Sequence, residues 1–594
     1  MAADGSAELA EYDRIRRTNA DLNYGSAPGT LASSTGCVAA IGLGATLSAA
    51  HPDGRLDFYS PSLSATPAPA LSHCPVTVVS GSNADGGAAV EGDDSRADAA
   101  RFDRLVAAVN RLRPPGSVLI VIGVADAGQV PHLVPLIVDG PGFARGTLIS
   151  PSTQRAGYTQ LIDIAPTVFE LLGVGSPSSA VGQPVHVAGR HSSDTQAVVH
   201  SLIDANAAAQ AQRPWVPFFY VAMVVLHIAL LAVAVYFFYR RRQSVMQAQA
   251  QALPAACNDR PVGEHVADKR RFEPVMERAS LTVACLPVAT FLAALLPWWR
   301  APLAFGTHLA SIAAIMALVA VAAHRGPWRR WPLGPAAFVA SFTAFVLAAD
   351  VMTGSAMQLN SLAGYSPLDA GRFIGFGNVS FGIFAAAVLL SAAYLGQRLT
   401  GWRRVVLLSG MGVAAVLVVG TPGWGSDVGG VIALTPAVIA LTLRGAGVRL
   451  SAIRVVGCGV AGVLAVAGFA ALDYSRSPAD RTYLGRFVQQ LFDGTADVVI
   501  RRKAEANVNL LFTSHLTLLV LAVAAFVILV AWRRGAGLRR LLGIYPCLRA
   551  GLVALLFAAT FGLAVNDFGI AIPAFMAVLA APLVIATSLR ALRT

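Results

Sequence analysis

Three short segments combine glycine with polar or ionisable residues in an otherwise apolar part of the chain. They cover residues 371–378, 421–430 and 566–569, and they contain Arg372, Asn378, Asp427, Asn566 and Asp567. An arginine can hold a phosphate or carboxylate through two parallel hydrogen bonds. The carboxylates could act as a base, as a cation site or as partners of the arginine. Glycine lets the backbone approach a ligand closely. The pattern predicts a site for an anionic group.

We expect these side chains to line one pocket, with Asp350 close by. Ionisable residues at membrane depth are costly and usually face a cavity. Non-helical backbone there is tolerated only when it is buried in protein or lines water. Tight turns outside a membrane also favour glycine, asparagine and aspartate, which is the alternative for each string alone. Three strings on one side of the membrane favour a site.

The elements that must position these strings are membrane-spanning helices. The chain of 594 residues is 55% hydrophobic and 13% charged, with mean hydropathy +0.60, whereas soluble domains carry about 25% charged residues. Apolar runs long enough to span a bilayer predict about eleven helices. These fall near 216–239, 281–298, 303–323, 333–352, 375–395, 405–420, 429–443, 455–472, 511–532, 548–565 and 570–589.

This pattern predicts an α/β soluble domain followed by an all-α polytopic bundle. The soluble domain covers residues 1–214 and the first spanning helix 215–239. A loop follows at 240–279, and a bundle of about ten further helices occupies 280–594.

Arginine marks alternate loops, and basic loops stay in the cytoplasm. The loops after the odd-numbered spans are rich in arginine, as at 240–242, 329–330, 403–404 and 533–534. We therefore expect a multi-pass plasma-membrane protein with a cytoplasmic C-terminus, an extracytoplasmic soluble domain and the three strings on the outer side. The loop at 473–514 breaks the trend, because it carries Arg501, Arg502 and Lys503. Arg486, Phe487, Leu491 and Phe492 predict a short amphipathic helix there, with a plain solvated loop as the alternative.

The start of the chain conflicts with an exported domain. It reads MAADGSAELAEYDRIRR, which lacks the apolar core of a signal peptide. We expect an upstream segment that carries the signal. The alternative is an inverted topology, which the arginine pattern opposes.

Charge and cysteine usage exclude two other classes of protein. The net charge of +12 comes almost entirely from arginine in loops, so we expect no nucleic acid as a partner. The six cysteines form no CxxC pair, which argues against a zinc site. Cys37 and Cys74 lie in the predicted outer domain, where either a disulfide or two buried thiols fits the sequence.

The soluble domain reads as α/β in its second half. Residues 102–113 and 163–172 have the apolar spacing of helices. The runs at 118–124 and 133–138 are nearly continuous and β-branched, and we expect the first to be a buried parallel strand.

Four motifs in this half resemble the C-terminal half of the alkaline phosphatase/sulfatase superfamily. They are residues 121–128, 132–142, 160–167 and 171–173, in the order that family shows. The resemblance implies that Asp126 and His132 correspond to metal ligands. Ala127 stands where the family has a ligating histidine, and we find no N-terminal strand with the family's first aspartate and nucleophile. A divalent metal would therefore meet an incomplete ligand set, and we expect no cofactor and a degenerate domain rather than an active hydrolase.

Other conspicuous residues of the domain are expected to be structural. Asp163 and Thr167 sit near a helix start, where aspartate suits the positive end of the helix dipole. His51 and His73 show no serine or aspartate partner at a diagnostic spacing, so we expect them to be surface or core residues.

Three functions compete. The first is a bacterial cell-envelope protein whose bundle handles a lipid-linked or anionic substrate at the outer face, by transferase chemistry or by presentation. A membrane lipid or lipid-linked precursor, and other envelope proteins, would be its partners. The second is a transporter or flippase, although polar residues gather at one face rather than mid-span. The third is an exported metal-dependent hydrolase. Alanine, glycine, valine and arginine bias fits a high-GC bacterium of actinobacterial type.

Overall fold

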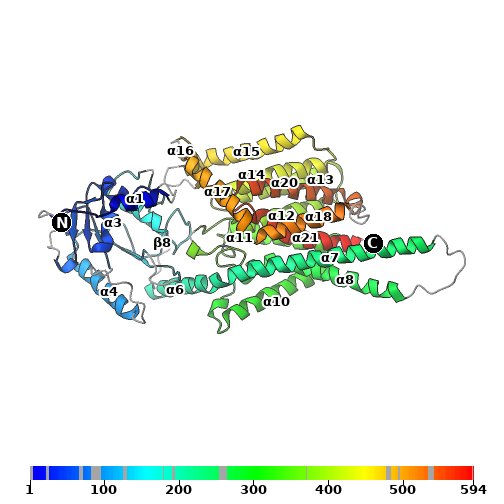
Figure 1. Cartoon of the computed structure of the whole chain (residues 1–594), viewed down its shortest axis with the longest axis horizontal. Coiled ribbons are helices and arrows are strands. Elements are labelled where there is room, and N and C mark those ends of the chain that lie inside the picture. Colours follow the sequence, from blue (N-terminus) through cyan, green and yellow to red (C-terminus); the bar gives the residue numbers. More distant parts are fainter. Residues whose placement is uncertain are drawn as a thin grey trace. The chain divides into compact units, whose positions relative to one another are not determined.

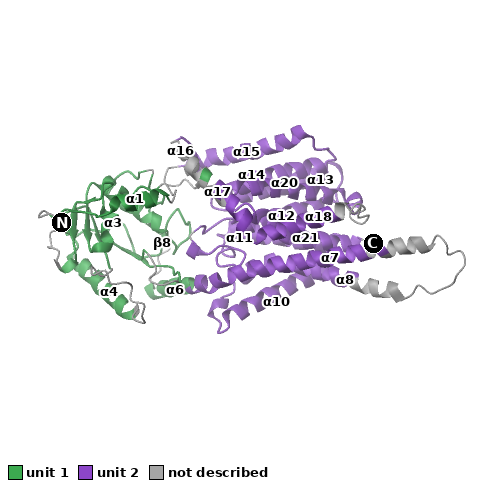
Figure 2. Cartoon of the chain, viewed as in Figure 1, with its two compact units in different colours: residues 1–206, 495–502 green, residues 207–494, 503–594 purple. Residues whose placement is uncertain are grey.

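The computed structural model divides the chain into two compact units (Figure 2). Unit 1 is residues 1–206 with 495–502, and unit 2 is residues 207–494 with 503–594. The structure describes residues 5–21, 26–65, 71–81, 95–124, 130–177, 179–189, 194–252, 264–369, 371–476, 483–492, 496–532, 541–566, 568–591 and 593. The division falls inside helix α6 (Thr195–Gln212), a few residues before the predicted boundary at 214.

Unit 1 begins with a parallel three-stranded sheet in the order β4-β2-β5. The strands are β4 (Phe58–Ser60), β2 (Val38–Ile41) and β5 (Val76–Val79). All four residues of β2 are buried, and two of them, Val38 and Ala40, form a small core with Ala32, Ala45, Ala49 and Leu56. Tyr12 joins this core, and burial raises the pKa of its hydroxyl. We did not predict these N-terminal strands, because they are short and two of the residues of β2 are alanines.

The second half of unit 1 differs from the expectation of a buried parallel strand. Strand β6 (Leu119–Ile122) pairs antiparallel with β7 (Leu136–Asp139), with Leu119 opposite Asp139, and it is only half-buried. Parallel neighbours need a long crossover, usually a helix, and the described residues between β6 and β7 form none. Helix α4 (Ser95–Leu112) matches the predicted helix but begins earlier. The helix expected at 163–172 is a 3-10 turn (Leu161–Asp163) followed by α5 (Ile164–Leu171).

The remaining elements of unit 1 are short. They are α1 (Tyr12–Asp21), α2 (Thr30–Thr35), α3 (Thr46–Ala49) and the antiparallel pairs β1 (Ala7–Glu8) with β3 (Arg55–Leu56) and β8 (Leu148–Ile149) with β9 (His186–Val187).

Unit 2 is a bundle of apolar helices (Figure 1). Its helices are α7 (Val216–Ala252), α8 (Glu264–Ala284), α9 (Leu286–Ala293), α10 (Ala304–Arg325), α11 (Gly334–Met352), α12 (Asn378–Gly396), α13 (Gly401–Gly420), α14 (Val428–Gly445), α15 (Ala452–Tyr474), α16 (Tyr483–Phe492), α18 (Leu516–Trp532), α20 (Pro546–Val565) and α21 (Ala571–Ala591). Helix α17 (Ala496–Thr513) is shared, because its residues up to 502 belong to unit 1. Within the described residues, ten helical stretches are long and apolar enough to cross a membrane. A bent pair would make eleven.

The bent pair explains the difference from the predicted ninth span. Residues 511–513 belong to α17, and α18 starts at Leu516 after a bend of 75°. Ser514 accepts a hydrogen bond from the backbone of Leu516 through its side chain, which favours a helix start there. The predicted second span also ends too late, because α9 stops at Ala293 and Trp298 lies in a 3-10 turn.

Helices α12 and α21 form the centre of the bundle. Nearly every residue of α12 is buried, and this helix packs on α11, α20 and α21. A helix that is apolar all round has no face suited to water, so it belongs inside a bundle. The predicted loop at 240–279 is helical at both ends, because α7 continues to Ala252 and α8 begins at Glu264. The predicted short helix in the loop at 473–514 is present as α16.

Candidate functional site

The first and second glycine-rich strings touch at a close backbone approach. The backbone N–H of Phe376 donates to the carbonyl of Gly425 at 2.9 Å. Gly375 has a left-handed φ of 77°, and a Cβ there would collide with the same carbonyl. Arg372 is half-buried, and its Nη1 lies 3.5 Å from the Gly425 carbonyl oxygen. Two loops that are about fifty residues apart are therefore joined at the end of the bundle where α12 and α14 begin.

The second and third strings meet at the start of α14. Asp427 is buried and caps this helix, because its Oδ1 accepts a hydrogen bond from the Gly430 N–H at 3.0 Å. The side chain of Asn566 lies so close to Gly429 that a Cβ on this glycine would collide with it. Asn507 of α17 donates to the backbone carbonyl of Asn566, and the Gly569 N–H donates to Asn507 Oδ1 at 2.7 Å. Asn507 thus ties the third string in place.

Asp350 anchors a buried polar chain at the same end. This residue is 1% exposed, and its Oδ1 accepts from the Met357 N–H at 2.7 Å. Its Oδ2 accepts from Gln358 Nε2 at 3.1 Å. Gln358 Oε1 in turn accepts from the hydroxyl of Ser380, in the first turn of α12. The chain Asp350–Gln358–Ser380 therefore couples the end of α11 to the start of α12.

The segment between α11 and α12 is non-helical over most of its length and largely buried. Residues 358–363 are all buried. Gln212 Nε2 donates to the Ser361 carbonyl at 2.8 Å, and the Ser361 hydroxyl lies 3.3 Å from the carbonyl of Thr290 in α9. Long connections without regular structure are usually functional. Irregular backbone enclosed by apolar helices also needs internal partners for its polar groups, and these contacts supply them.

Backbone strain gathers in this region. Ser355, Asn360 and Ser426 have φ of 59°, 59° and 48°, the left-handed region that residues with a Cβ rarely adopt. Ser355 accepts a hydrogen bond from the Gly375 N–H at 2.8 Å, which holds the first string. Strained residues persist where the surrounding structure fixes them, and they cluster at functional sites. The strain supports a ligand site here.

Several buried polar atoms of unit 2 have no hydrogen-bond partner among the described residues, and we single out two of them at this end. They are Asn566 Nδ2, on a residue that is 6% exposed, and Asn360 Oδ1. A buried amide without a partner costs about 1–3 kcal/mol. A ligand oxygen would satisfy Asn566 Nδ2, and the adjacent start of α14 carries the positive end of a helix dipole. We name Asp350, Gln358, Arg372, Asp427 and Asn566 the polar cluster.

Two predicted residues, Asn378 and Asp567, are not part of the polar cluster. Asn378 is half-buried in the first position of α12. Asp567 lies outside the described residues. Sequence reasoning missed Gln358, Ser380 and Ser355. The signal that could have found them is the polar run at 353–361 between two apolar spans, which is too long for a tight turn.

In unit 1 the predicted metal ligands do not form a described site. Asp126 lies outside the described residues, and His132 is exposed in the segment between β6 and β7. Asp163, by contrast, is fully buried, with four donors: the hydroxyls of Ser150 and Ser152 and the N–H groups of Gln160 and Gln183. Thr167 donates to the Asp163 carbonyl and accepts from the Val185 N–H. These bonds are those of the structural role that we expected for both residues.

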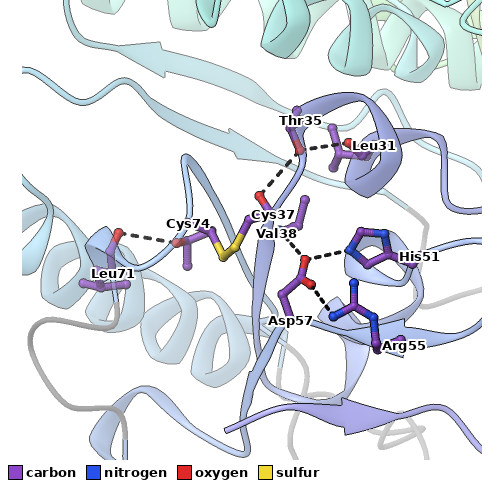
Figure 3. The surroundings of a disulfide bond; sticks show 10 residues. Leu31, Thr35, Cys37, Val38, His51, Arg55, Asp57, Leu71 and Cys74 are labelled. Atoms are coloured by element: carbon purple, nitrogen blue, oxygen red, sulfur yellow. Dashed lines mark hydrogen bonds and ion pairs between the residues drawn. A yellow bond between two sulfur atoms is a disulfide. The ribbon is translucent and has the colours of Figure 1, made fainter. Parts of the chain in front are cut away.

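Figure 3 shows a disulfide between Cys37 and Cys74 beside a charged group. His51 Nε2 lies 2.7 Å from Asp57 Oδ2, and Arg55 Nη1 lies 3.1 Å from Asp57 Oδ1. His51 thus has an aspartate partner, which corrects the expectation from spacing. This pair could not be predicted from the sequence, because it forms only when a turn and strand β3 bring Asp57 back to His51. His73 is exposed, and its ring lies within 4.8 Å of the two cysteine sulfurs, which the disulfide occupies.

No protein-family model, curated protein or solved structure matches this chain. Its class follows from its own helices. Ten apolar helical stretches among the described residues make it a multi-pass integral membrane protein.

Proposed function

We propose that the chain is a bacterial plasma-membrane protein with unit 1 outside the cell. Its polar cluster holds the anionic group of a lipid-linked or anionic envelope substrate. The observation that carries this proposal is the convergence of three separate strings on the buried Asp427 and Asn566, with Arg372 at hydrogen-bond distance from the same loop. Two other features support it: the partnerless Asn566 amide and the three left-handed residues.

Each residue of the polar cluster has a different role in binding a phosphate or carboxylate. Asn566 Nδ2 offers a neutral donor beside the start of α14. Arg372 offers a charge, and its contact with Gly425 is long enough at 3.5 Å for the guanidinium to turn to a ligand. Asp427 fixes the start of α14 through its helix cap. Asp350 holds the segment between α11 and α12 that places Gly375.

Binding of a fluorescent polyprenyl phosphate to the purified full chain in nanodiscs tests this proposal. We expect Arg372→Ala to weaken binding about tenfold, because a charged hydrogen bond contributes about 1.5–3 kcal/mol. Asp427→Asn keeps a good helix cap and removes the charge, so altered affinity in this variant reports electrostatics rather than folding. Arg300→Ala, on the same predicted side of the bundle, is the matched control and should bind normally. Unchanged affinity in both Arg372→Ala and Asp427→Asn would overturn the proposal.

A transporter or flippase is the alternative, and one observation favours it. His227, in the apolar part of α7, is buried and contacts the carbonyl of Val578 in α21 at 3.1 Å, so polar contacts are not confined to one end. The same labelled lipid in proteoliposomes separates the two functions. Protein-dependent movement of the label between leaflets, measured by quencher accessibility, would assign transport, whereas binding without movement supports holding.

For unit 1 we propose a degenerate phosphatase-like module that binds or scaffolds rather than hydrolyses. The resemblance at residues 121–173 supports it, together with the alanine at position 127. Elemental analysis of the purified full chain tests it. We expect zinc and manganese well below one ion per chain. One ion per chain in the unchanged protein, with this ion lost in His132→Ala, would instead support the metal-dependent hydrolase.

A further inference from the structure

A cavity of about 270 Å³ opens at the end of unit 2 away from the polar cluster. It lies where α13 and α20 begin and α14 ends, and its lining includes Gly401, Arg404, Arg444, Gly445, Ala446 and Cys547. Helix α13 connects the two ends: it starts at the cavity with Gly401 and ends at Gly420, next to the second string. Its 20 residues give a separation of about 30 Å. The cavity is therefore a second site.

The lining is positively charged. Arg404 and Arg444 are both half-buried, and none of the described residues that line the cavity is acidic. Arg404 is held by its Nε, which donates to the carbonyls of Gly396 and Leu399 at 3.2 and 2.9 Å. This anchoring fixes the guanidinium at the end of α12 and leaves its Nη groups to bind something else. An arginine fork matches the oxygens of a phosphate.

Two helix starts add to the positive potential. Helices α13 and α20 both begin at the cavity, and neither is capped by the side chain of its own N-cap residue. In the first turn of α20, the N–H of Cys547 donates a hydrogen bond to Gln397 Oε1 at 3.1 Å. Gly401 and Gly447, both in the lining, have left-handed φ of 55° and 83° and open space where a Cβ would stand. These positions keep the cavity free of side chains, and helix starts favour anions.

The surroundings are those of a membrane interface. Trp402, next to the cavity, is 71% exposed, and tryptophan gathers at the headgroup level of bilayers. Further along α13, Val406, Val413 and Leu417 are also exposed. They form an apolar stripe on one face with Trp402, because they recur at helical spacing. The cavity itself is below the volume of about 300–1,000 Å³ that whole drug-sized ligands occupy, so it suits a headgroup.

We propose that this cavity binds the phosphate of an anionic membrane lipid. Arg404 and Arg444 contact the phosphate oxygens, and the starts of α13 and α20 add their helix dipoles. Basic pockets between spanning helices bind such headgroups in general. The site is independent of the polar cluster, so its failure would leave the proposed function standing.

Native mass spectrometry of the purified full chain, exchanged into mixtures of cardiolipin, phosphatidylglycerol and phosphatidylcholine, tests the proposal. We expect selective retention of the anionic lipids and a loss of about tenfold in Arg444→Gln, because the Arg444 side chain has no partner among the described residues that this change would remove. The control is Arg449→Gln, which removes the same charge from the same connection but lies outside the lining and should retain lipid normally. Ala446→Trp fills the cavity mouth without a change in charge and should also lose lipid.

Each other outcome would overturn the proposal. Equal loss in Arg444→Gln and Arg449→Gln would show a general surface charge effect. Normal retention in Ala446→Trp, in a chain whose thermal midpoint matches that of the unchanged protein, would place the lipid elsewhere. Inorganic phosphate that binds as tightly as the lipids and displaces none of them would make the site one for a free anion.

Discussion

Buried polar side chains in this protein differ in whether their hydrogen bonds are complete. Asp163 receives four donors and has no capacity left for a ligand. Asn566 Nδ2, which is similarly buried, has no partner among the described residues. A complete set indicates a structural role and an incomplete set a site, because an unsatisfied buried group costs free energy that only a ligand or water recovers.

Asp163→Asn tests the structural role. The amide replaces one acceptor oxygen with an NH₂ group that faces two donors, so unit 1 should lose about 2–4 kcal/mol of stability. Thermal unfolding and limited proteolysis of the full chain would measure this loss. Asp103→Asn, on the exposed face of α4, should change stability by less than about 0.5 kcal/mol. Equal effects of the two changes would contradict the assignment.

At this scale the sequence predicted residue types better than residue partners. The chemistry of Arg372, Asp427 and Asn566 was visible because charged and amide residues are rare next to apolar spans. Gln358 and Ser380 were not, because their significance depends on Asp350, which lies on a different element. His51 and Asp57 were missed for the same reason: only the turn before β4 brings them together.

Among the elements, α21 contains a proline that leaves one backbone carbonyl without its helical hydrogen-bond partner. Pro582 has no N–H, so the carbonyl of Val578 one turn earlier lacks its helical partner. His227 Nε2 of α7 lies 3.1 Å from this oxygen, and Nδ1 lies 2.7 Å from the Met223 carbonyl. The pair fixes α7 against α21 inside the bundle.

A double-mutant cycle tests this contact. His227→Leu should destabilise the bundle by about 1 kcal/mol, because such hydrogen bonds between spanning helices average roughly 0.6 and reach about 1.7 kcal/mol. In Pro582→Ala the helix itself satisfies Val578, so His227→Leu should cost much less in that background. Thermal midpoints of the detergent-purified chain measure the cycle. Additive effects would show that the carbonyl of Val578 is not the partner that matters.

Elements were predictable in proportion to their length. Apolar runs of about 20 residues identified the spanning helices, but not the bend at Ser514, which depends on one local side chain. Strands β2, β4 and β5 have three or four residues each, too few for a periodic pattern. Strand β6 showed its apolar pattern plainly, but the direction of its partner depends on how the chain between the strands returns.

For the whole molecule, composition alone indicated a soluble unit followed by a membrane bundle. The described helices confirm a multi-pass bundle. Which side of the membrane unit 1 occupies stays a prediction from the arginine pattern. The two anion sites proposed here lie at opposite ends of α13. If both hold, the bundle contacts anionic groups at both membrane faces.

The disulfide of unit 1 has a consequence for how the protein can be followed in cells. It closes a segment with a sequence separation of 37 residues, which lowers the entropy of the unfolded chain by an equivalent of about 4 kcal/mol. It also joins the chain just before β2 to the chain just before β5, so the neighbouring strands are covalently held in register. Such bonds persist in oxidising compartments and are rare in the cytosol. The oxidation state of Cys37 and Cys74 therefore indicates the compartment in which unit 1 folded. A gel shift after thiol alkylation measures this oxidation state.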